Sequence, residues 1–477
     1  MRPLRALALV VVALAALGCA HYPVNAKLDR YQQDVGYRFP AFRPDDPADQ
    51  LFVCLSFSGG GTRAAALAYG VMAELKRTEV TWNGQKIRLL DEVDCISSVS
   101  GGSFTAAYYG LFGEDLFKDF YDRFLTRDIQ GDLLAKAVVS LPKLASPYWS
   151  RIDVAGELYD QTVFDTKTYQ TLVDSRRRPF VILNATDMVT GEHFEFTQSQ
   201  FDFLGSDLTP YKVGRAVAAS SAFPFLLTPL TLVNHAPLSG FGPPLEYANA
   251  LKDFYADPRR WQWADRQRTY LDGTRPYVHL MDGGLSDNIG LRSIERAYRA
   301  TDGFIAQRIN NAATRRLVVI AVNAGTEGAD TLSARGTAPG LIAMGSATAT
   351  IAMENYSFDT VDLMRSQLRE RIQAELDLAA CQAALDTHCP AAPKLPAFPL
   401  ALRTCVVEVA FESIVDPVRR EYFLHLGTNF HLPKKDVDAL IEVGGEILRD
   451  SPWFKRLLDS LGREAAGTPL PKPGNCS

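Results

Sequence analysis

The sequence predicts an α/β fold, a three-layer sandwich in which helices flank a mostly parallel central sheet. Two observations lead to this prediction. Short apolar runs end in glycine turns, and most are separated by stretches of helical spacing, which is the order expected of strands alternating with helices. The composition agrees, because 47% of the residues are hydrophobic and 22% are charged, as is usual for a folded globular protein.

The first strand is expected at residues 51–57, "LFVCLSF", a β-branched and aromatic run that stops at glycines. The segment after it has Leu67, Val71 and Leu75 four residues apart, which indicates a helix. The same order of strand, tight turn and helix recurs at "DEVDCISSV" and "SGGSFTAAYYGLF". Further buried strands are expected at residues 179–187, 276–284, 315–325 and 404–411.

Later segments are less regular. Residues 360–386 have the pattern of a long amphipathic helix, and residues 434–462 that of a last helical region, broken at Gly444-Gly445. Residues 232–275 are rich in proline, glycine and aromatics and are expected to be an insertion, either a lid or a plain surface excursion.

The N-terminal residues predict export. Arg2 and Arg5 precede twelve apolar residues, too few to span a bilayer, and small residues lead to Cys19. The segment resembles a bacterial lipobox, in which this cysteine is lipidated, although an ordinary signal peptide cleaved near Ala20 is the alternative. Lipidation of Cys19 would place the protein in the bacterial cell envelope, as an outer-membrane lipoprotein facing the periplasm.

The remaining cysteines divide into two groups. Cys54 and Cys95 lie within strand-like runs and are expected to be small buried hydrophobic residues. Four others could form disulfides in an oxidising compartment, with Cys381 and Cys389 the nearest pair in sequence and Cys405 and Cys476 late in the chain.

Several partners and cofactors are not expected. The formal net charge of -5 offers no basic surface for nucleic acid. No cysteine or histidine spacing is typical of a zinc site, so we predict no metal and no cofactor. The oligomeric state is left open.

Three consecutive glycines, Gly59, Gly60 and Gly61, connect the first strand to its helix. Backbone without side chains allows several N–H groups to converge, and the helix that follows adds positive potential. Such a loop binds anions, either a phosphate or the oxyanion of a tetrahedral intermediate. The spacing matches neither nucleotide motif, GxxxxGK[ST] nor GxGxxG.

A serine and an aspartate follow strands in the same way. Ser100 lies in "SVSGG", at the turn between a strand and a helix, where a nucleophile is exposed. Ser98 stands where an elbow of the form GxSxG has its first glycine. Asp282 ends an apolar run before two glycines, and Asp272 and Asp287 are competing carboxylates.

Together these segments resemble the patatin-like phospholipase family and the related cytosolic phospholipases. The resemblance covers roughly residues 50–325 and rests on an SGGGxR loop at residues 58–63, the elbow at residues 98–102 and a DGG element at residues 282–284. Two softer matches are "TDMVTGEHFEF" at residues 186–196 and "AVAASSAFPFLLTP" at residues 216–229.

The resemblance implies a patatin-like three-layer sandwich and a Ser-Asp dyad without histidine. Ser100 would be the nucleophile and Asp282 its base, with the N–H groups of Gly59, Gly60 and Gly61 as the oxyanion hole. Arg63 would support the loop or contact a lipid phosphate. The substrate would be a membrane phospholipid or lysophospholipid, and the apolar residues 222–230 would line an acyl pocket.

The resemblance also orders the chain into segments. We expect a signal peptide at 1–18, an N-terminal linker at 19–49 and a patatin-like catalytic domain at 50–325 with its insertion at about 232–275. A mainly helical extension at 326–477 would pack on the same core.

Two other functions fit the same sequence. A conventional Ser-His-Asp carboxylesterase would recruit His425 or His431, although His425 lies in a strand-like run and is expected to be a packing or surface residue. A lipid-binding or scaffolding lipoprotein would keep the fold without turnover. Covalent labelling of Ser100 separates this last function from the first two.

Overall fold

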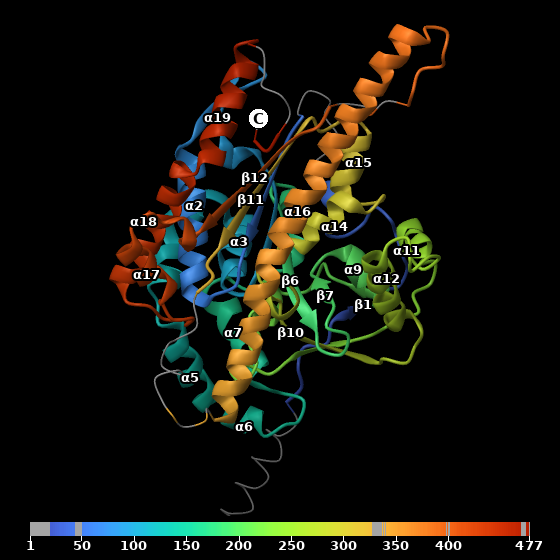
Figure 1. Ribbon diagram of the computed structural model, residues 1–477. Helices are drawn as coiled ribbons and strands as arrows, with labels where there is room; N and C mark the ends of the chain where they lie inside the picture. The colour runs from blue at the N-terminus through green and yellow to red at the C-terminus, as the bar shows by residue number, and fades with distance from the viewer. Residues whose placement is uncertain are drawn as a thin grey trace, which may run out of the picture.

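A central eight-stranded sheet organises the chain (Figure 1). The computed structural model describes residues 20–42, 50–326, 336, 338, 340–396, 398, 401–468 and 474–476. The strands of the sheet are β2 (Leu51–Phe57), β5 (Val93–Val99), β6 (Phe180–Asp187), β7 (His193–Glu195), β9 (Leu230–Val233), β10 (Tyr277–Asp282), β11 (Arg316–Asn323) and β12 (Arg403–Ala410). Two small pairs lie outside it: β1 (Ala26–Lys27) with β8 (Ser206–Asp207), and β3 (Glu79–Trp82) with β4 (Gln85–Arg88).

The long strands form the parallel part of this sheet. Across it the order is β12, β11, β2, β5, β6, β10 and β9, with β7 paired to β6. Neighbours from β12 to β6 are parallel, whereas β10 is antiparallel to β6 and to β9. Every residue of β2, β5 and β6 is buried, because helices cover both faces. The predicted α/β sandwich with a mostly parallel sheet is confirmed.

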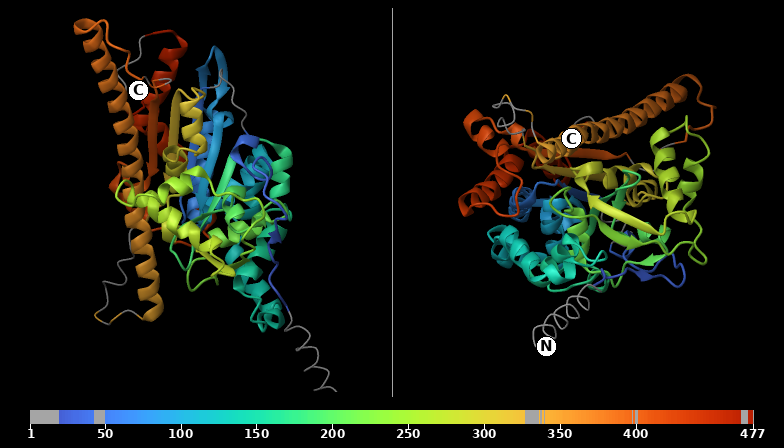
Figure 2. Two further views of the ribbon diagram at one scale, coloured as in Figure 1. Left: turned by 90° about the vertical axis from the view of Figure 1, so that its right-hand side faces the viewer. Right: turned by 90° about the horizontal axis from the view of Figure 1, so that it is seen from below.

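Helices lie on both faces of the sheet (Figures 1 and 2). They are α2 (Gly61–Arg77), α3 (Ser100–Phe112), α4 (Leu116–Phe120), α5 (Ile129–Val139), α6 (Leu141–Leu144), α7 (Arg151–Thr162), α8 (Tyr169–Ser175), α9 (Gln198–Phe203), α10 (Val213–Ser220), α11 (Leu245–Ala250), α12 (Pro258–Leu271), α13 (Gly284–Asp287), α14 (Arg292–Arg299), α15 (Phe304–Asn310), α16 (Leu341–His388), α17 (Pro417–Leu424), α18 (Lys434–Asp450) and α19 (Pro452–Ala465). On one face α2 packs against α3 and α18, and α14, α15 and α16 lie on the other.

The helix α18 runs without interruption through Gly444-Gly445, so the predicted break there is wrong. The two glycines serve close packing instead. A Cβ on Gly444 would lie 2.6 Å from the carbonyl oxygen of Leu67 in α2, and one on Gly70 would lie 2.1 Å from that of Ile441. The predicted helical region is instead divided at Ser451, which lies between the end of α18 at Asp450 and the start of α19 at Pro452.

The helix predicted at residues 360–386 is longer than expected. As α16 it has 48 residues, which corresponds to about 70 Å of helix. Its C-terminal end projects beyond the rest of the molecule (Figures 1 and 2), whereas its N-terminal third packs on α13. There Met353 contacts the turn that follows Asp282, since a Cβ on Gly284 would lie 2.0 Å from the methyl carbon of Met353.

Two disulfides correct the predictions for the cysteines. Cys54 and Cys95 are opposite each other in the register of β2 and β5 and are joined, rather than being separate buried thiols. Cys405 in β12 is joined to Cys476. Cys381 and Cys389, the pair nearest in sequence, are free and exposed. Both lie at the projecting end of α16, where helical geometry separates their backbones.

The C-terminal extension completes the sheet. Its strand β12 pairs in parallel with β11 along eight residues, and α18 and α19 pack beside it. The segment 232–275 connects β9 to β10, which pair with each other, and contains α11 and α12.

The structure does not test the predictions for the N-terminal residues. The signal peptide at 1–18 and Cys19 lie outside the described residues. Among the helices that the structure describes, none combines the length and apolar character needed to cross a membrane.

Candidate active site

Ser100 occupies a strained turn between β5 and α3. Its φ is +48°, a left-handed conformation that is unfavourable for a residue with a side chain. The turn is held from behind, because the Ser100 N–H donates to the hydroxyl of Ser220 at 2.9 Å. The strand and helix therefore fix the direction of the Ser100 side chain, which is 7% exposed.

The glycines after Ser100 allow the elbow to touch the glycine loop. A Cβ on Gly101 would lie 2.0 Å from the carbonyl oxygen of Gly61. The N–H of Gly102 donates to the carbonyl of Ser58 at 3.2 Å. A side chain at either position would push the two turns apart.

Ser98, which replaces the first glycine of the elbow, is accommodated by hydrogen bonds. Its hydroxyl accepts from Ser103 at 3.2 Å and donates weakly to the carbonyl of Ile182 at 3.4 Å. The Ser103 hydroxyl lies 2.9 Å from that of Ser220. Ser98 thus belongs to a buried row of hydroxyls that ends at the Ser100 backbone.

The glycine loop offers two free backbone donors rather than the predicted three. The N–H of Gly59 donates to the carbonyl of Asn288 at 2.9 Å and is therefore already engaged. Within the described part of the chain, the N–H groups of Gly60 and Gly61 have no partner. Their φ values of +137° and +60° require glycine.

Arg63 braces this loop from inside the protein. Its side chain is buried, with Nε donating to the carbonyl of Ala324 at 3.0 Å and Nη1 to the carbonyl of Leu426. Burial lowers the pKa of Arg63 to about 10, so it stays charged at neutral pH. Of the two roles considered for Arg63, these contacts correspond to loop support.

Asp282 ends β10 and is buried beside Ser100. The N–H of Gly284 donates to its Oδ1 at 2.8 Å, and a hydrogen-bonding interaction with the Ser100 side chain lowers the pKa of the carboxylate. Burial raises the pKa of Asp282 to about 7, against the lowering effect of these two hydrogen bonds. Its backbone is tied to the segment after α10, because its N–H donates to the carbonyl of Ala222.

The competing carboxylates are engaged elsewhere. Asp272 lies in an exposed turn, where it accepts from the N–H and hydroxyl of Thr274. Asp287 is buried, and its Oδ2 accepts from the N–H of Arg292 at the start of α14. Asp272 thus stabilises a local turn, and Asp287 accepts from the first residue of α14.

The two late histidines also lie outside the dyad. His425 follows α17, not the strand-like run predicted, and its Nδ1 is 3.0 Å from the carbonyl oxygen of Glu421. His431 is half exposed, with Nδ1 3.8 Å from Asp128. In the described residues, no three His, Cys, Asp or Glu side chains gather as metal ligands would.

Comparison with known proteins then places the chain. The family model described as patatin-like phospholipase matches residues 55–294, half of the chain. The chain belongs to the patatin-like phospholipase family. The matched range contains the glycine loop, the elbow and the Asp282 turn.

Solved structures of related proteins are only distantly similar. Human GIVD cytosolic phospholipase A2 has 14% identity and a TM-score of 0.44, with 90% of this chain and 65% of that chain covered. VipD from Legionella pneumophila has 12% identity and a TM-score of 0.31, with 86% and 67% covered. The chain thus spans slightly less than two thirds of the human enzyme. No curated protein matches it.

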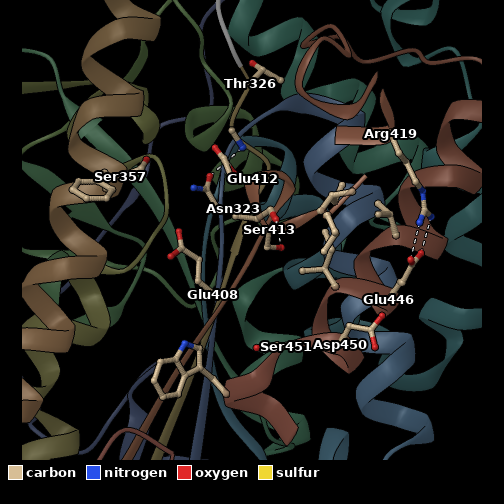
Figure 3. A pocket seen from close by; sticks show the side chains of 18 of the residues that line it. Asn323, Thr326, Ser357, Glu408, Glu412, Ser413, Arg419, Glu446, Asp450 and Ser451 are labelled. Atoms are coloured by element: carbon tan, nitrogen blue, oxygen red, sulfur yellow. Dashed lines mark hydrogen bonds and ion pairs between the residues drawn. The ribbon is translucent and has the colours of Figure 1, made fainter. Parts of the chain in front are cut away.

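A large cavity adjoins this patatin-like site. It has a volume of about 1450 Å³ and lies between α16 and the C-terminal helices (Figure 3). Ser357 stands on the α16 side, Arg419 and Glu446 pair on the other, and Glu408 lies between them. Ser100 and Asp282 do not line the cavity, but Asn288 does. Residues 222–230, expected in an acyl pocket, do not line it either, and Phe225 is 53% exposed.

Two residues of the site have no predicted role. Ser220 lies in the segment "AASSAFP", whose resemblance to the family was noted without a function for any serine. Asn288 lies six residues after Asp282 in "DGGLSDN". Nothing in its own spacing indicates that its carbonyl engages the glycine loop, which depends on the packing of two distant turns.

Proposed function

We propose that the protein is a lipid acyl hydrolase, a phospholipase or lysophospholipase, that uses Ser100 as nucleophile and Asp282 as base. The observation that carries the proposal is the position of Ser100 at a strained turn beside the buried carboxylate of Asp282, whose pKa it lowers, next to two unused backbone donors. Strain and unsatisfied donors are costly, and both are typical of catalytic sites.

In acylation the Asp282 carboxylate takes the Ser100 proton as Oγ attacks the ester carbonyl carbon. The N–H groups of Gly60 and Gly61 are available to the negative oxygen that develops. When the ester bond breaks, the proton passes from Asp282 to the leaving alcohol. Because its pKa is raised to about 7, Asp282 is a stronger base than an ordinary carboxylate and still ionises near neutral pH.

In deacylation a water molecule replaces the alcohol. Asp282 takes a proton from the water, whose oxygen attacks the acyl carbon, and the same backbone donors serve the second oxyanion. Collapse of the intermediate breaks its bond to the Ser100 oxygen, which regains a proton, and a fatty acid leaves.

The neighbouring cavity supports a lipid as the substrate. Its volume of about 1450 Å³ exceeds the ~300–1,000 Å³ usual for small-molecule pockets. Phe358, Ile414, Ile447 and Trp453 supply apolar surface along it, and acidic and basic side chains also line it. A long acyl chain with a polar headgroup combines the same two properties.

Labelling experiments test the proposal. A fluorophosphonate probe should label the wild-type protein and not Ser100→Ala, and Asp282→Asn should lose hydrolysis of phospholipid and lysophospholipid vesicles. A double His425→Ala, His431→Ala variant should retain activity, in contrast to a Ser-His-Asp enzyme. Absence of both labelling and hydrolysis in the wild-type protein would contradict the proposal and favour a binding lipoprotein.

We also propose that the protein is an exported lipoprotein anchored through Cys19. The two disulfides support an oxidising compartment, since such bonds are rare in the cytosol. Metabolic labelling with a radioactive fatty acid should mark the wild-type protein but not Cys19→Ala, and the variant should leave the membrane fraction. Equal labelling of both would contradict lipidation at this residue.

A further inference from the structure

Asn288 brings an unused hydrogen-bond acceptor to the dyad. Its side chain is buried, at 7% exposure, and Oδ1 has no hydrogen-bond partner among the described residues. The position is defined by the two glycine turns. A Cβ on Gly59 would lie 2.5 Å from Asn288 Oδ1 and 3.3 Å from Cβ of Ser100. The acceptor therefore faces the same small space as the nucleophile.

The same acceptor is also close to the base. A Cβ on Gly284 would lie 2.8 Å from Asn288 Oδ1 and 3.2 Å from Oδ1 of Asp282. A side chain on either glycine would displace Asn288 Oδ1, and beside Gly284 the methyl carbon of Met353 lies 2.0 Å from the same Cβ position. Asn288 thus lies between the two turns that carry the reacting groups.

The backbone of Asn288 fixes the side chain there. Its carbonyl accepts the N–H of Gly59, and this contact does not depend on the identity of the side chain. A buried acceptor that stays unsatisfied is destabilising, so native proteins rarely keep one without a ligand or water. Asn288 is also one of the residues that line the large cavity.

We propose that Asn288 Oδ1 holds the water that hydrolyses the acyl-enzyme, an inference that rests on the proposed function. One hydrogen of the water is donated to Asn288 Oδ1 and the other is transferred to the Asp282 carboxylate. The water oxygen bonds to the acyl carbon, the bond from that carbon to the Ser100 oxygen then breaks, and Asp282 returns its proton to Ser100.

The chemistry of the acyl-enzyme favours water as this donor. After the alcohol has left, the bound ester has only a carbonyl oxygen and a hydrocarbon chain. The carbonyl oxygen accepts hydrogen bonds and the chain makes none, so neither can donate to Asn288 Oδ1. A diacyl phospholipid likewise has no hydroxyl on its glycerol to donate. Asn288 would therefore act in deacylation and leave acylation largely unchanged.

Pre-steady-state kinetics with a p-nitrophenyl ester test this assignment. In Asn288→Leu, which keeps the size of the side chain and removes the acceptor, we expect steady-state turnover to fall about 10- to 100-fold. The rate of the initial p-nitrophenol burst should stay within about threefold of wild type, because acylation does not use this water. Acyl-Ser100 should accumulate and be detectable by mass spectrometry of the intact protein.

The controls separate this inference from a structural effect and from the proposed function. Asn310→Leu makes the same replacement at an exposed position and should not alter either phase. Equal losses of burst and turnover in Asn288→Leu, or no loss, would overturn the role for water. A loss confined to lysophospholipids would instead assign the acceptor to a substrate hydroxyl. If wild type shows neither burst nor turnover, the proposed function itself fails.

Discussion

At the scale of single residues, the site combines a strained serine with a carboxylate whose ionisation is opposed by burial. Ser100 is held at φ +48° by the hydroxyl of Ser220, and Asp282 loses solvent without gaining a cationic partner. The two effects act together, because a carboxylate that is reluctant to ionise accepts a proton more readily from Ser100.

The raised pKa of Asp282 sets the expected pH dependence. The base must be ionised, so activity should be low below pH 7 and rise as the pH passes through about 7. The profile of kcat/KM for a soluble ester measures this, because it reports ionisation of the free enzyme. An acid limb near pH 4, the ordinary value for aspartate, would contradict the environment described for Asp282.

Ser98 should be replaceable by glycine with little effect on catalysis. Its hydroxyl bonds Ser103 and Ile182, away from the reacting groups. We expect Ser98→Gly to keep kcat within about threefold and to lose roughly 1–2 kcal/mol of unfolding free energy, from backbone entropy and the lost hydrogen bond. Denaturant unfolding measures the loss, and Ser98→Ala separates the hydroxyl from the backbone effect. A large fall in kcat for both variants would show that the row of hydroxyls orients Ser100.

The sequence indicates some of these residues and not others, for a physical reason. Glycines and a serine at strand ends have a local cause, the backbone of a tight turn, which spacing reveals. Engagement of the Gly59 N–H by Asn288 depends on two turns that lie more than two hundred residues apart. Such a contact produces no periodic pattern and no compositional bias, so a single sequence does not indicate it.

At the scale of elements, the glycine loop is shaped by strands and turns outside it. Arg63 links it to Ala324 after β11 and to Leu426 after α17, and the N–H of Thr62 donates to the carbonyl of Asn429. The loop therefore keeps its two free donors only while these segments stay in place.

Replacing Arg63 should affect all substrates equally. We expect Arg63→Lys, which cannot reach both carbonyls, to lower kcat about 10- to 100-fold through displacement of the donors. The loss should be the same for p-nitrophenyl esters and phospholipids, because it does not involve a phosphate. Arg77→Lys at the exposed end of the same helix is the matched control. A loss confined to phospholipids would assign Arg63 to the substrate phosphate.

The predictions of secondary structure were correct where a continuous apolar run marks a buried strand. They failed where the outcome depends on contacts between segments far apart in the sequence. The strands at β6, β10, β11 and β12 match their apolar runs. Gly444-Gly445 is a weak position for an isolated helix, yet contact with α2 requires small residues there. Cys54 and Cys95 were expected to be small buried hydrophobic residues because they lie in apolar strand-like runs, but the parallel register places them opposite each other.

At the scale of the whole molecule, two disulfides join segments that are far apart in the sequence. Cys54–Cys95 joins the strand before the glycine loop to the strand before Ser100, across a separation of 41 residues. Cys405–Cys476 joins the edge strand to the last described residues, across 71. Each link reduces the conformational freedom of the unfolded chain.

Removal of the first link should therefore lower stability. We expect a Cys54→Ala, Cys95→Ala variant to lose roughly 2–4 kcal/mol of unfolding free energy, measured by denaturant unfolding of oxidised protein. Cys381→Ala, Cys389→Ala removes the two exposed thiols and should unfold like wild type. Equal stability of all three proteins, or four reactive thiols in the unreduced wild type, would contradict the pairing.

The carbonyls that hold Arg63 and Thr62 have one more consequence. Ala324, Leu426 and Asn429 all lie outside residues 55–294, the range that the family model matches. A fragment excised at those limits would contain the proposed dyad and the glycine loop and still lack the carbonyls that hold this loop. A shortened protein, or a fusion that borrows this site, should therefore retain the C-terminal third of the polypeptide.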